Sequence, residues 1–376
     1  MSTLVSENIA RLKPYPPGKP IEEVQRELGV SDVLKVASNE NPIGPSPRAL
    51  AAIEAAARRL HVYPDGGGYY LKSAIGERLG FERSEIILGN GSNELLELLI
   101  RTFMSPGGLN AVTSQTTFIV YRLVMQACGA ELREAAMGSD LTYDLEAMAD
   151  KVDENTRLVF IANPNNPTGT YIGRDSLNRF LSTIDQRCGN GPNGSPIVVL
   201  DEAYCEYVDA DDYPDGLALV RSRPRTMVMR TFSKAYGLAG LRCGYGLASA
   251  DLIDLMNRVR QPFNVNSLAL AGCLAALRDQ SFLDQVVAIN RTEKVWLADK
   301  LRQRGGKPVP TQTNFVLVDF GVDTAKLYVE MQKQGVIVRP MAAYGLPTTV
   351  RITVGTREQN ERIVRALDAS LHTLER

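Results

Sequence analysis

Histidine, cysteine and long apolar runs are scarce in this chain of 376 residues. It has two histidines and five widely spaced cysteines, and no two of the cysteines form a Cys-x-x-Cys pair. We therefore expect neither a metal site nor a disulfide framework, and reduced cysteines are typical of cytoplasmic proteins. No apolar run approaches the roughly 18 residues of a membrane-spanning helix, and residues 1–12 lack the apolar core of a signal peptide. These absences predict a cytoplasmic protein that is not bound to a membrane.

An excess of charge of either sign is also missing. The chain has 42 Lys and Arg residues against 43 Asp and Glu residues, which gives a formal net charge of −1. A balanced charge argues against nucleic acid or an anionic membrane as the partner. The length is sufficient for two lobes that each bury a core, and the hydrophobic content of 44% is ordinary for a globular protein. Small anionic ligands would have to be held locally by individual arginines.

One polar segment follows a short apolar run and contains a candidate reactive lysine. The run at 226–229 predicts a buried strand, and the polar residues that follow it are Thr231, Ser233, Lys234 and Arg242. A lysine can form a Schiff base with an aldehyde where its surroundings favour the neutral amine. Hydroxyl groups and an arginine nearby can hold a phosphate. A ligand with both groups would be pyridoxal phosphate, whereas the alternative interpretation is a surface lysine in a glycine-rich loop.

Two further apolar runs end in polar side chains. Residues 197–200 predict a parallel strand covered on both faces, and Asp201 and Tyr204 follow it. Ligands of open α/β sheets bind beyond the carboxyl ends of strands, where a carboxylate can keep the pyridine nitrogen of the cofactor protonated. A helix N-cap is the alternative for Asp201, and core packing is the alternative for Tyr204. The run at 158–161 leads into a proline-rich segment whose first polar side chain is Asn163.

These three segments, in this order, resemble the aspartate-aminotransferase superfamily of pyridoxal-phosphate enzymes (fold type I). The matching motifs are Asn-Pro-Asn-Asn-Pro-Thr-Gly, Asp-Glu-Ala-Tyr and Ser-Lys-Ala-Tyr-Gly-Leu-Ala-Gly-Leu-Arg. The resemblance implies that Lys234 carries the cofactor as a Schiff base and that Asp201 pairs with the pyridine nitrogen. The other implied cofactor contacts are Asn163 and Tyr204 at the ring hydroxyl, and Thr231, Ser233 and Arg242 at the phosphate.

Two more segments take cofactor roles once the resemblance is established. Gly91, Ser92 and Asn93 lie between a predicted strand and a predicted helix, and free N–H groups at the start of a helix can hold a phosphate. Phe118 falls where the superfamily has an aromatic ring stacked on the cofactor, with a packed core Phe as the alternative. Tyr63, in a Tyr-Pro-Asp motif, is similar to the tyrosine that reaches the cofactor phosphate of a partner subunit, which implies a homodimer.

The resemblance also implies an α/β fold of two domains. We expect a large domain with a mostly parallel sheet flanked by helices, and a smaller α+β domain built from the N-terminal segment and the C-terminal third. The predicted divisions are an N-terminal arm at 1–30, a large cofactor-binding domain at 45–260, and a small domain formed by 31–44 together with 261–376. The arm is expected to rest on its own chain or on a partner subunit, with disorder as the alternative.

Candidate substrate contacts lie mainly in the predicted small domain. Arg351 alternates with apolar residues in a predicted strand, and a half-buried arginine needs an anionic partner. A structural ion pair would satisfy it, but the superfamily has its substrate-carboxylate arginine at this position. Arg339, at the end of another predicted strand, is a second candidate anion ligand. The resemblance adds Tyr15 from the arm and Asn39 from a polar turn as substrate-side contacts.

Longer blocks are similar to the histidinol-phosphate aminotransferase family, among them Tyr-Pro-Asp-Gly, Gly-Asn-Gly-Ser-Asn-Glu, Pro-Phe-Asn-Val-Asn and Arg-Ile-Thr-Val-Gly-Thr. That family transfers an amino group between histidinol phosphate and 2-oxoglutarate, with glutamate as the other product, in histidine biosynthesis. The resemblance implies small-molecule substrates, with Lys234, Asp201 and Tyr204 as the catalytic side chains. Related alternatives are an aromatic amino acid aminotransferase and a threonine-phosphate decarboxylase. A transcription regulator of the same fold is disfavoured, because no helix-turn-helix segment or basic patch precedes residue 30.

Overall fold

A mixed sheet of seven strands forms the centre of the larger part of the computed structural model, which describes residues 4–14, 18–104, 107–189 and 193–374. Its neighbours pair in parallel except around β8, which is antiparallel to both adjacent strands. The strands in spatial order are β2 (Ile86–Gly89), β8 (Gly244–Leu247), β7 (Thr226–Thr231), β6 (Ile197–Asp201), β5 (Thr156–Ala162), β3 (Asn110–Ser114) and β4 (Glu131–Ala135). The three apolar runs predicted as strands are confirmed as β5, β6 and β7.

Helices cover both faces of this sheet, and the strand side chains divide between two cores. Successive residues of a strand point to opposite faces. In β6, Val198 and Leu200 therefore belong to one core and Ile197 and Val199 to the other. The first face packs against α3 (Pro47–Ala57), α4 (Tyr69–Leu79), α7 (Leu145–Ala149), α8 (Arg174–Cys188), α9 (Gly216–Ser222) and α11 (Ser267–Leu277). The second packs against α5 (Ser92–Phe103), α6 (Val120–Ala127) and α10 (Ala250–Asn257).

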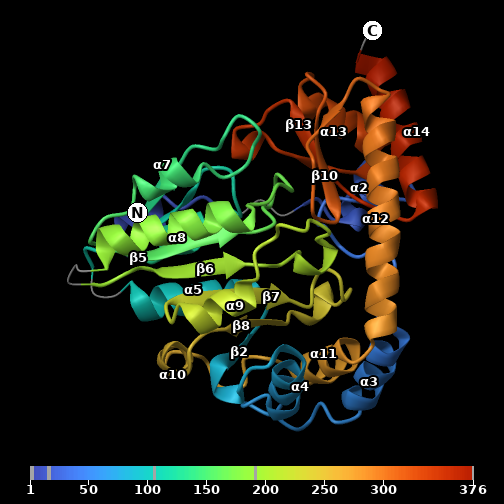
Figure 1. Cartoon of the computed structure of the whole chain (residues 1–376). Coiled ribbons are helices and arrows are strands. Elements are labelled where there is room, and N and C mark those ends of the chain that lie inside the picture. The colour runs from blue at the N-terminus through green and yellow to red at the C-terminus, as the bar shows by residue number, and fades with distance from the viewer. Residues whose placement is uncertain (1–3, 15–17, 105–106, 190–192, 375–376) are drawn as a thin grey trace.

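A second, smaller sheet lies beside the long helix α12 (Gln280–Arg302), which runs along one side of the molecule from the region of α3 and α11 (Figure 1). Its antiparallel strands, in order, are β12 (Arg339–Pro340), β13 (Thr349–Thr353), β10 (Phe315–Asp319) and β9 (Lys307–Pro308). Helices α12, α13 (Thr324–Lys333) and α14 (Arg357–Leu374) enclose its apolar core. A two-stranded pairing joins β1 (Leu34–Lys35) in parallel to β11 (Val336–Ile337).

This arrangement confirms the predicted fold class of the aspartate-aminotransferase type. The domain boundaries stay a prediction. Helix α11 follows the predicted boundary at residue 261, yet it packs against α3 and α4 of the larger part. The described portion of the N-terminal arm contains α1 (Glu7–Ala10) and α2 (Ile21–Leu28), and it rests on its own chain: Asn8 donates to the carbonyls of Gln126 and Ala127, and Val24 is buried.

Four short 3₁₀ turns complete the described elements: η1 (Arg83–Glu85), η2 (Cys205–Tyr207), η3 (Ala239–Leu241) and η4 (Ala342–Tyr344). Of these, η3 lies between Lys234 and the start of β8, and its C-terminal neighbour is Arg242. No helix in the described ranges is long and apolar enough to cross a membrane.

Candidate active site

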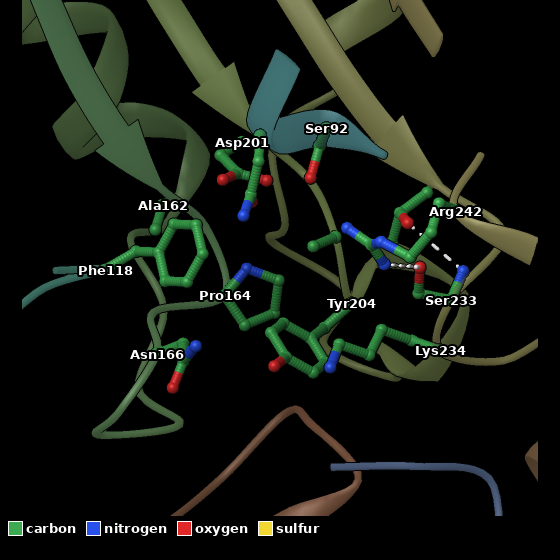
Figure 2. Close-up of a pocket in the computed structure, with 13 residues that line it drawn as sticks. Ser92, Phe118, Ala162, Pro164, Asn166, Asp201, Tyr204, Ser233, Lys234 and Arg242 are labelled. Carbon is green, nitrogen blue, oxygen red and sulfur yellow. Dashed lines mark hydrogen bonds between the residues drawn. The ribbon is translucent and has the colours of Figure 1, made fainter. Parts of the chain in front are cut away.

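A cavity lies at one edge of the large sheet, where several strands end. Strands β2, β3, β5, β6 and β7 run in the same direction, so their carboxyl ends lie along this edge, as in other open α/β sheets. Strand β8 runs the opposite way and therefore begins there, just after Arg242. The cavity is lined by Ser92, Asn93, Phe118, Ala162, Pro164, Asn166, Asp201, Ala203, Tyr204, Thr231, Ser233, Lys234 and Arg242 (Figure 2).

Asp201, the last residue of β6, lies on the wall of the cavity and is almost fully buried. Its Oδ2 accepts a hydrogen bond from the Tyr121 hydroxyl at 2.9 Å. Its Oδ1 is buried without a hydrogen-bond partner among the described residues. Burial raises the pKa of Asp201 to about 6, while the Tyr121 hydrogen bond acts to lower it. A buried carboxylate oxygen of this kind calls for a charged donor, and a protonated pyridine nitrogen supplies one.

Lys234 enters the cavity from the segment that follows β7 (Figure 2). Its Nζ donates to the backbone carbonyl of Ser38 at 3.0 Å. Burial, and then the positive charge of Arg351, lower the pKa of this amine to about 8; Arg242 acts in the same direction. A substantial fraction of the amine is therefore neutral near physiological pH, which is the state that attacks an aldehyde.

Several residues near Lys234 in the cavity have groups that can hold a dianion. Ser92 and Asn93 are the first residues of α5, where unpaired backbone N–H groups and the helix dipole favour an anion. Gly91 precedes them with φ of 73°, and a Cβ on it would lie 2.4 Å from a guanidinium nitrogen of Arg242. The hydroxyls of Thr231 and Ser233 complete this set, which forms the phosphate end of the cavity. Helix start, two hydroxyls and a guanidinium fit a phosphate group.

Tyr204 and Phe118 supply the aromatic surfaces of the cavity (Figure 2). The Tyr204 hydroxyl accepts a hydrogen bond from Asn39 Nδ2 at 2.8 Å. Burial raises the pKa of Tyr204 to about 12, so its hydroxyl keeps a proton that it can donate. Phe118, predicted as the stacking ring, also lines the cavity. Asn39 is buried behind Tyr204 and is not part of the lining.

Asn163, predicted at the ring hydroxyl, does not reach the cavity. Its Nδ2 donates to the carbonyl of Ile172 at 3.1 Å, and its Oδ1 accepts from the N–H of Ile172 at 2.8 Å. Side chains alternate along β5, so Ala162 lines the cavity while Asn163 continues the face that packs against α8. Asn166 lines the cavity instead (Figure 2). The geometry therefore favours Asn166 over Asn163 for this position.

The two predicted substrate arginines are neighbours on adjacent strands of the small sheet. Arg339 of β12 and Arg351 of β13 are directly opposite each other in the antiparallel register. Two arginines at facing positions of a strand pair can bind one anion together. Arg351 is buried, and it donates to Asn166 Oδ1 at 2.5 Å and to the carbonyl of Ala37 at 2.7 Å. Tyr15 lies outside the described residues.

The side chain of Tyr63 is exposed to solvent. Its exposed fraction is 79%, and its ring stacks on Phe263 with the two centroids 4.9 Å apart. It does not line the cavity of its own chain. Its predicted role therefore depends on a second copy of the chain.

The cavity is also lined by four residues that were not predicted, Ala162, Pro164, Asn166 and Ala203, and the unpredicted Tyr121 contacts Asp201 from behind the lining. A signal was available for Tyr121, because it lies three residues after Phe118, and the turn between them, in which the N–H of Tyr121 donates to the Phe118 carbonyl, brings the two side chains together. For Asn166, the segment contains several asparagines in irregular backbone, and composition does not say which of them faces the cavity.

The lowered pKa of Lys234 can be tested on the cofactor-free protein. Competitive labelling with acetic anhydride, read by mass spectrometry over a pH series, is expected to show Lys234 becoming reactive with a midpoint near pH 8, because only the neutral amine reacts and its pKa is about 8. The substitution Arg351→Gln removes a positive charge and is expected to move the midpoint upward. A midpoint at the ordinary lysine value of about 10.4 would contradict this account of the site.

Comparison with known proteins agrees with the geometry. The chain matches the aminotransferase class I and II family over residues 31–367. It is 47% identical over 366 residues to histidinol-phosphate aminotransferase 2 of Pseudomonas aeruginosa, covering 97% of this chain and 96% of that protein. It is 48% identical over 365 residues to histidinol-phosphate aminotransferase of Anaeromyxobacter sp. strain Fw109-5, covering 97% and 98%.

A solved structure supports the same assignment. The histidinol-phosphate aminotransferase of Sinorhizobium meliloti, in complex with pyridoxal 5'-phosphate, superposes with a TM-score of 0.89 at 28% identity, over 100% of this chain and 99% of that chain. Pyridoxal phosphate is the cofactor of this family, and the cavity fits it at three points: the unpartnered Asp201 oxygen, the Lys234 amine and the phosphate end. The chain therefore belongs to the aminotransferase class I and II family, and within it to the pyridoxal-phosphate-dependent histidinol-phosphate aminotransferases.

Proposed function

We propose that this enzyme transfers the amino group of L-histidinol phosphate to 2-oxoglutarate, giving imidazole acetol phosphate and glutamate, as a step of histidine biosynthesis in the cytoplasm. The observation that carries the choice of substrate is the pair Arg339 and Arg351, opposite each other in the small sheet with Arg351 in contact with a cavity residue. Relatives that share 47–48% identity over nearly the whole chain carry the same activity in their names.

The side chains that line the cavity would hold the cofactor in one orientation. Pyridoxal phosphate, when bound, supplies an aldehyde that condenses with amines and a ring that accepts electrons from the substrate. Lys234 lies in the cavity as the amine for the aldehyde, and Asp201 offers Oδ1 to the ring nitrogen. Tyr204 and Asn166 would contact the ring hydroxyl. The phosphate would be held by Gly91, Ser92, Asn93, Thr231, Ser233 and Arg242.

Lys234 is also the proposed general base. An amine with a pKa of about 8 is close to the working pH, which is the condition for efficient proton transfer in both directions. The Ser38 carbonyl holds Nζ in the cavity through a 3.0 Å hydrogen bond when the amine is free. Lys234 would take the proton from the α-carbon of the substrate and later deliver a proton on the return path.

The two arginines would bind the anionic end of each substrate in turn. A phosphate dianion and a carboxylate each have at least two acceptor oxygens. The planar guanidinium group of an arginine can bind two of these oxygens through parallel hydrogen bonds. Histidinol phosphate has its phosphate where an amino acid has its carboxylate, so Arg351 and Arg339 can serve both half-reactions. Asn166 accepts from Arg351 and lines the cavity, and it therefore connects the substrate end with the cofactor end.

A homodimer is part of the proposal. Val62 and Tyr63, between α3 and α4, and Tyr70 of α4 are exposed, and all three line a hollow together with residues of α3, α4 and α11. An exposed apolar patch of this kind is typical of a protein interface. A second copy of the chain would cover it and bring Tyr63 to the phosphate end of the partner's cavity. The divisions 1–30, 45–260, and 31–44 with 261–376 are kept as the proposed arm and domains.

The substitution Lys234→Ala tests the lysine. Transamination is expected to fall by at least about 10²- to 10⁴-fold, because the general base is lost, while the cofactor still binds without a covalent link. Borohydride reduction followed by mass spectrometry should add the cofactor mass to the wild type but not to Lys234→Ala. Lys294→Ala is the matched control, because Lys294 is also buried with a lowered pKa but lies on α12 outside the cavity. Full activity of Lys234→Ala would refute the proposal.

The substrate is tested by mixing the cofactor-loaded protein with histidinol phosphate, glutamate or phenylalanine and following the visible absorbance of the bound cofactor. A rapid change with histidinol phosphate and glutamate, but not with phenylalanine, is expected. A comparable change with phenylalanine would indicate a broad aminotransferase, and release of carbon dioxide would indicate a decarboxylase.

Arg339→Gln is expected to raise the KM for histidinol phosphate by about ten- to hundredfold, since a hydrogen bond to a charged group contributes roughly 1.5–3 kcal/mol. The control is Arg304→Gln, which removes an arginine that pairs with Asp368 on the surface of the same domain. Equal KM values for Arg339→Gln and the wild type would remove Arg339 from the substrate site.

Sharing of sites between subunits is tested with mixed dimers. A homodimer of either variant, Lys234→Ala or Tyr63→Ala, is expected to be less active than the wild type. For Tyr63→Ala we expect the cofactor affinity to fall about tenfold. If Tyr63 acts on the partner's cavity, a mixed dimer of the two variants contains one intact site, and about half of the wild-type activity should return. If Tyr63 acts within its own chain, every site in the mixed dimer carries a defect and no activity returns.

A further inference from the structure

Tyr121 is a buried residue that the roles above leave out. It is the second residue of α6, has no exposed surface, and its hydroxyl donates to Asp201 Oδ2 at 2.9 Å. Its ring stacks on Phe160 of β5, with centroids 4.9 Å apart and planes 13° apart. The ring of the cavity residue Phe118 is nearly perpendicular to the Tyr121 ring, and the two ring centroids are 5.7 Å apart. Tyr121 therefore contacts both the candidate stacking ring and the candidate ring-nitrogen ligand.

We propose that Tyr121 is a positioning residue for the reaction: its hydrogen bond fixes the Asp201 carboxylate with Oδ1 toward the cofactor and keeps the shared proton on the ring nitrogen rather than on the carboxylate. The proposal rests on the proposed role of Asp201 and extends it to the group behind it.

The geometric part of the proposal depends on the different surroundings of the two Asp201 carboxylate oxygens. A buried aspartate can rotate about two side-chain bonds, and either oxygen could face the ligand. The hydrogen bond from Tyr121 occupies Oδ2, whereas Oδ1 is the one without a partner in the described ranges. Because the Tyr121 ring is held between Phe160 and Phe118, its hydroxyl has little freedom to follow a moving carboxylate.

The electrostatic part concerns which partner holds the proton. A hydrogen bond to the ionised form of a carboxyl lowers its pKa, and burial raises it. Around Asp201 the other titratable groups are Glu202, which raises its pKa, Lys234, which lowers it, and the hydroxyls of Tyr143 and Tyr204. Glu202 points to the opposite face of β6, where Arg230 binds it at 2.8 Å. Burial raises the pKa of Tyr121 itself far above its ordinary value, so it remains a donor.

Loss of the Tyr121 hydroxyl would therefore make Asp201 a stronger base. The proton between Asp201 and the ring nitrogen would move toward the carboxylate, and the ring would accept electrons less well. A residue that only fills the core would not have this effect, since phenylalanine fills nearly the same volume. The two interpretations differ in what happens to the protonation of the bound ring.

The experiment compares wild type and Tyr121→Phe after reconstitution with pyridoxal phosphate labelled with ¹⁵N in the ring. The ¹⁵N chemical shift of the variant is expected to move toward the unprotonated position, and kcat to fall by about ten- to hundredfold. Tyr143→Phe is the matched control: its hydroxyl is also buried next to the site but bonds Thr117 and the N–H of Ala162, not Asp201. That variant should lose stability without moving the ¹⁵N shift.

Coupling to Asp201 is tested with the double variant Tyr121→Phe, Asp201→Asn. If Tyr121 acts through Asp201, the loss in kcat of the double variant should equal that of Asp201→Asn alone, because interacting residues are not additive. If Tyr121→Phe does not fold, fluorinated tyrosines at position 121 keep the shape and strengthen the donor, and the ¹⁵N shift should move stepwise toward the protonated position.

An unchanged ¹⁵N shift in Tyr121→Phe, or across the fluorinated series, would overturn the proposal, as would additive losses in the double variant. These outcomes are separable from a failure of the proposed function. In that case the wild type itself would bind no cofactor, or would not respond to histidinol phosphate, whatever residue stands at position 121.

Discussion

The buried carboxylate of Asp201 is the constraint around which the rest of the site is arranged. A carboxylate at the end of a central strand, with one oxygen lacking a partner, is unfavourable in the empty protein. The cost is offset only when a charged donor enters the cavity. Parallel strands make this possible, because they bring Asp201, Thr231 and the α5 N-terminus to one edge of one sheet. Binding energy, orientation and electronic activation of the cofactor therefore depend on the same sheet topology.

Because side chains alternate along the strands, residues that face the cavity are next to residues that stabilise the protein interior. On β6, Asp201 faces the cavity, and the next residue, Glu202, faces the opposite core, where it forms a buried ion pair with Arg230. Arg230 in turn precedes Thr231, which faces the cavity. Neighbouring positions on β6 and β7 thus alternate between ligand contacts and an internal pair. That internal pair fixes the ends of the two strands relative to each other, because Arg230 belongs to β7 and the N–H of Glu202, just after β6, donates to the Met229 carbonyl of β7.

Much of the fold and of the cofactor end of the site could be predicted from the sequence, because apolar runs followed by polar residues identify strand ends. Lys234, Asp201 and Arg242 were found in this way, and their motifs then identified the family. For Asn163 the structure favours a neighbour instead, because side chains alternate along β5: Ala162 lines the cavity, and the side chain of Asn163 bonds the backbone of Ile172. The Tyr121–Asp201 bond joins residues 80 positions apart, a pairing that no local pattern contains. The role of Tyr63 stays a prediction, since it requires a second chain.

The short segment 37–39 connects the substrate end to the cofactor end. Its consecutive carbonyls accept hydrogen bonds from three side chains of different segments: Arg351 of β13, Lys234 in the loop after β7, and Asn314 just before β10. Asn39 also donates to Tyr204. An anion that draws Arg351 away from the Ala37 carbonyl would therefore act on the peptide unit next to the one that holds Lys234. In the proposed function, an anion bound by Arg351 would thus act next to the carbonyl that holds Lys234.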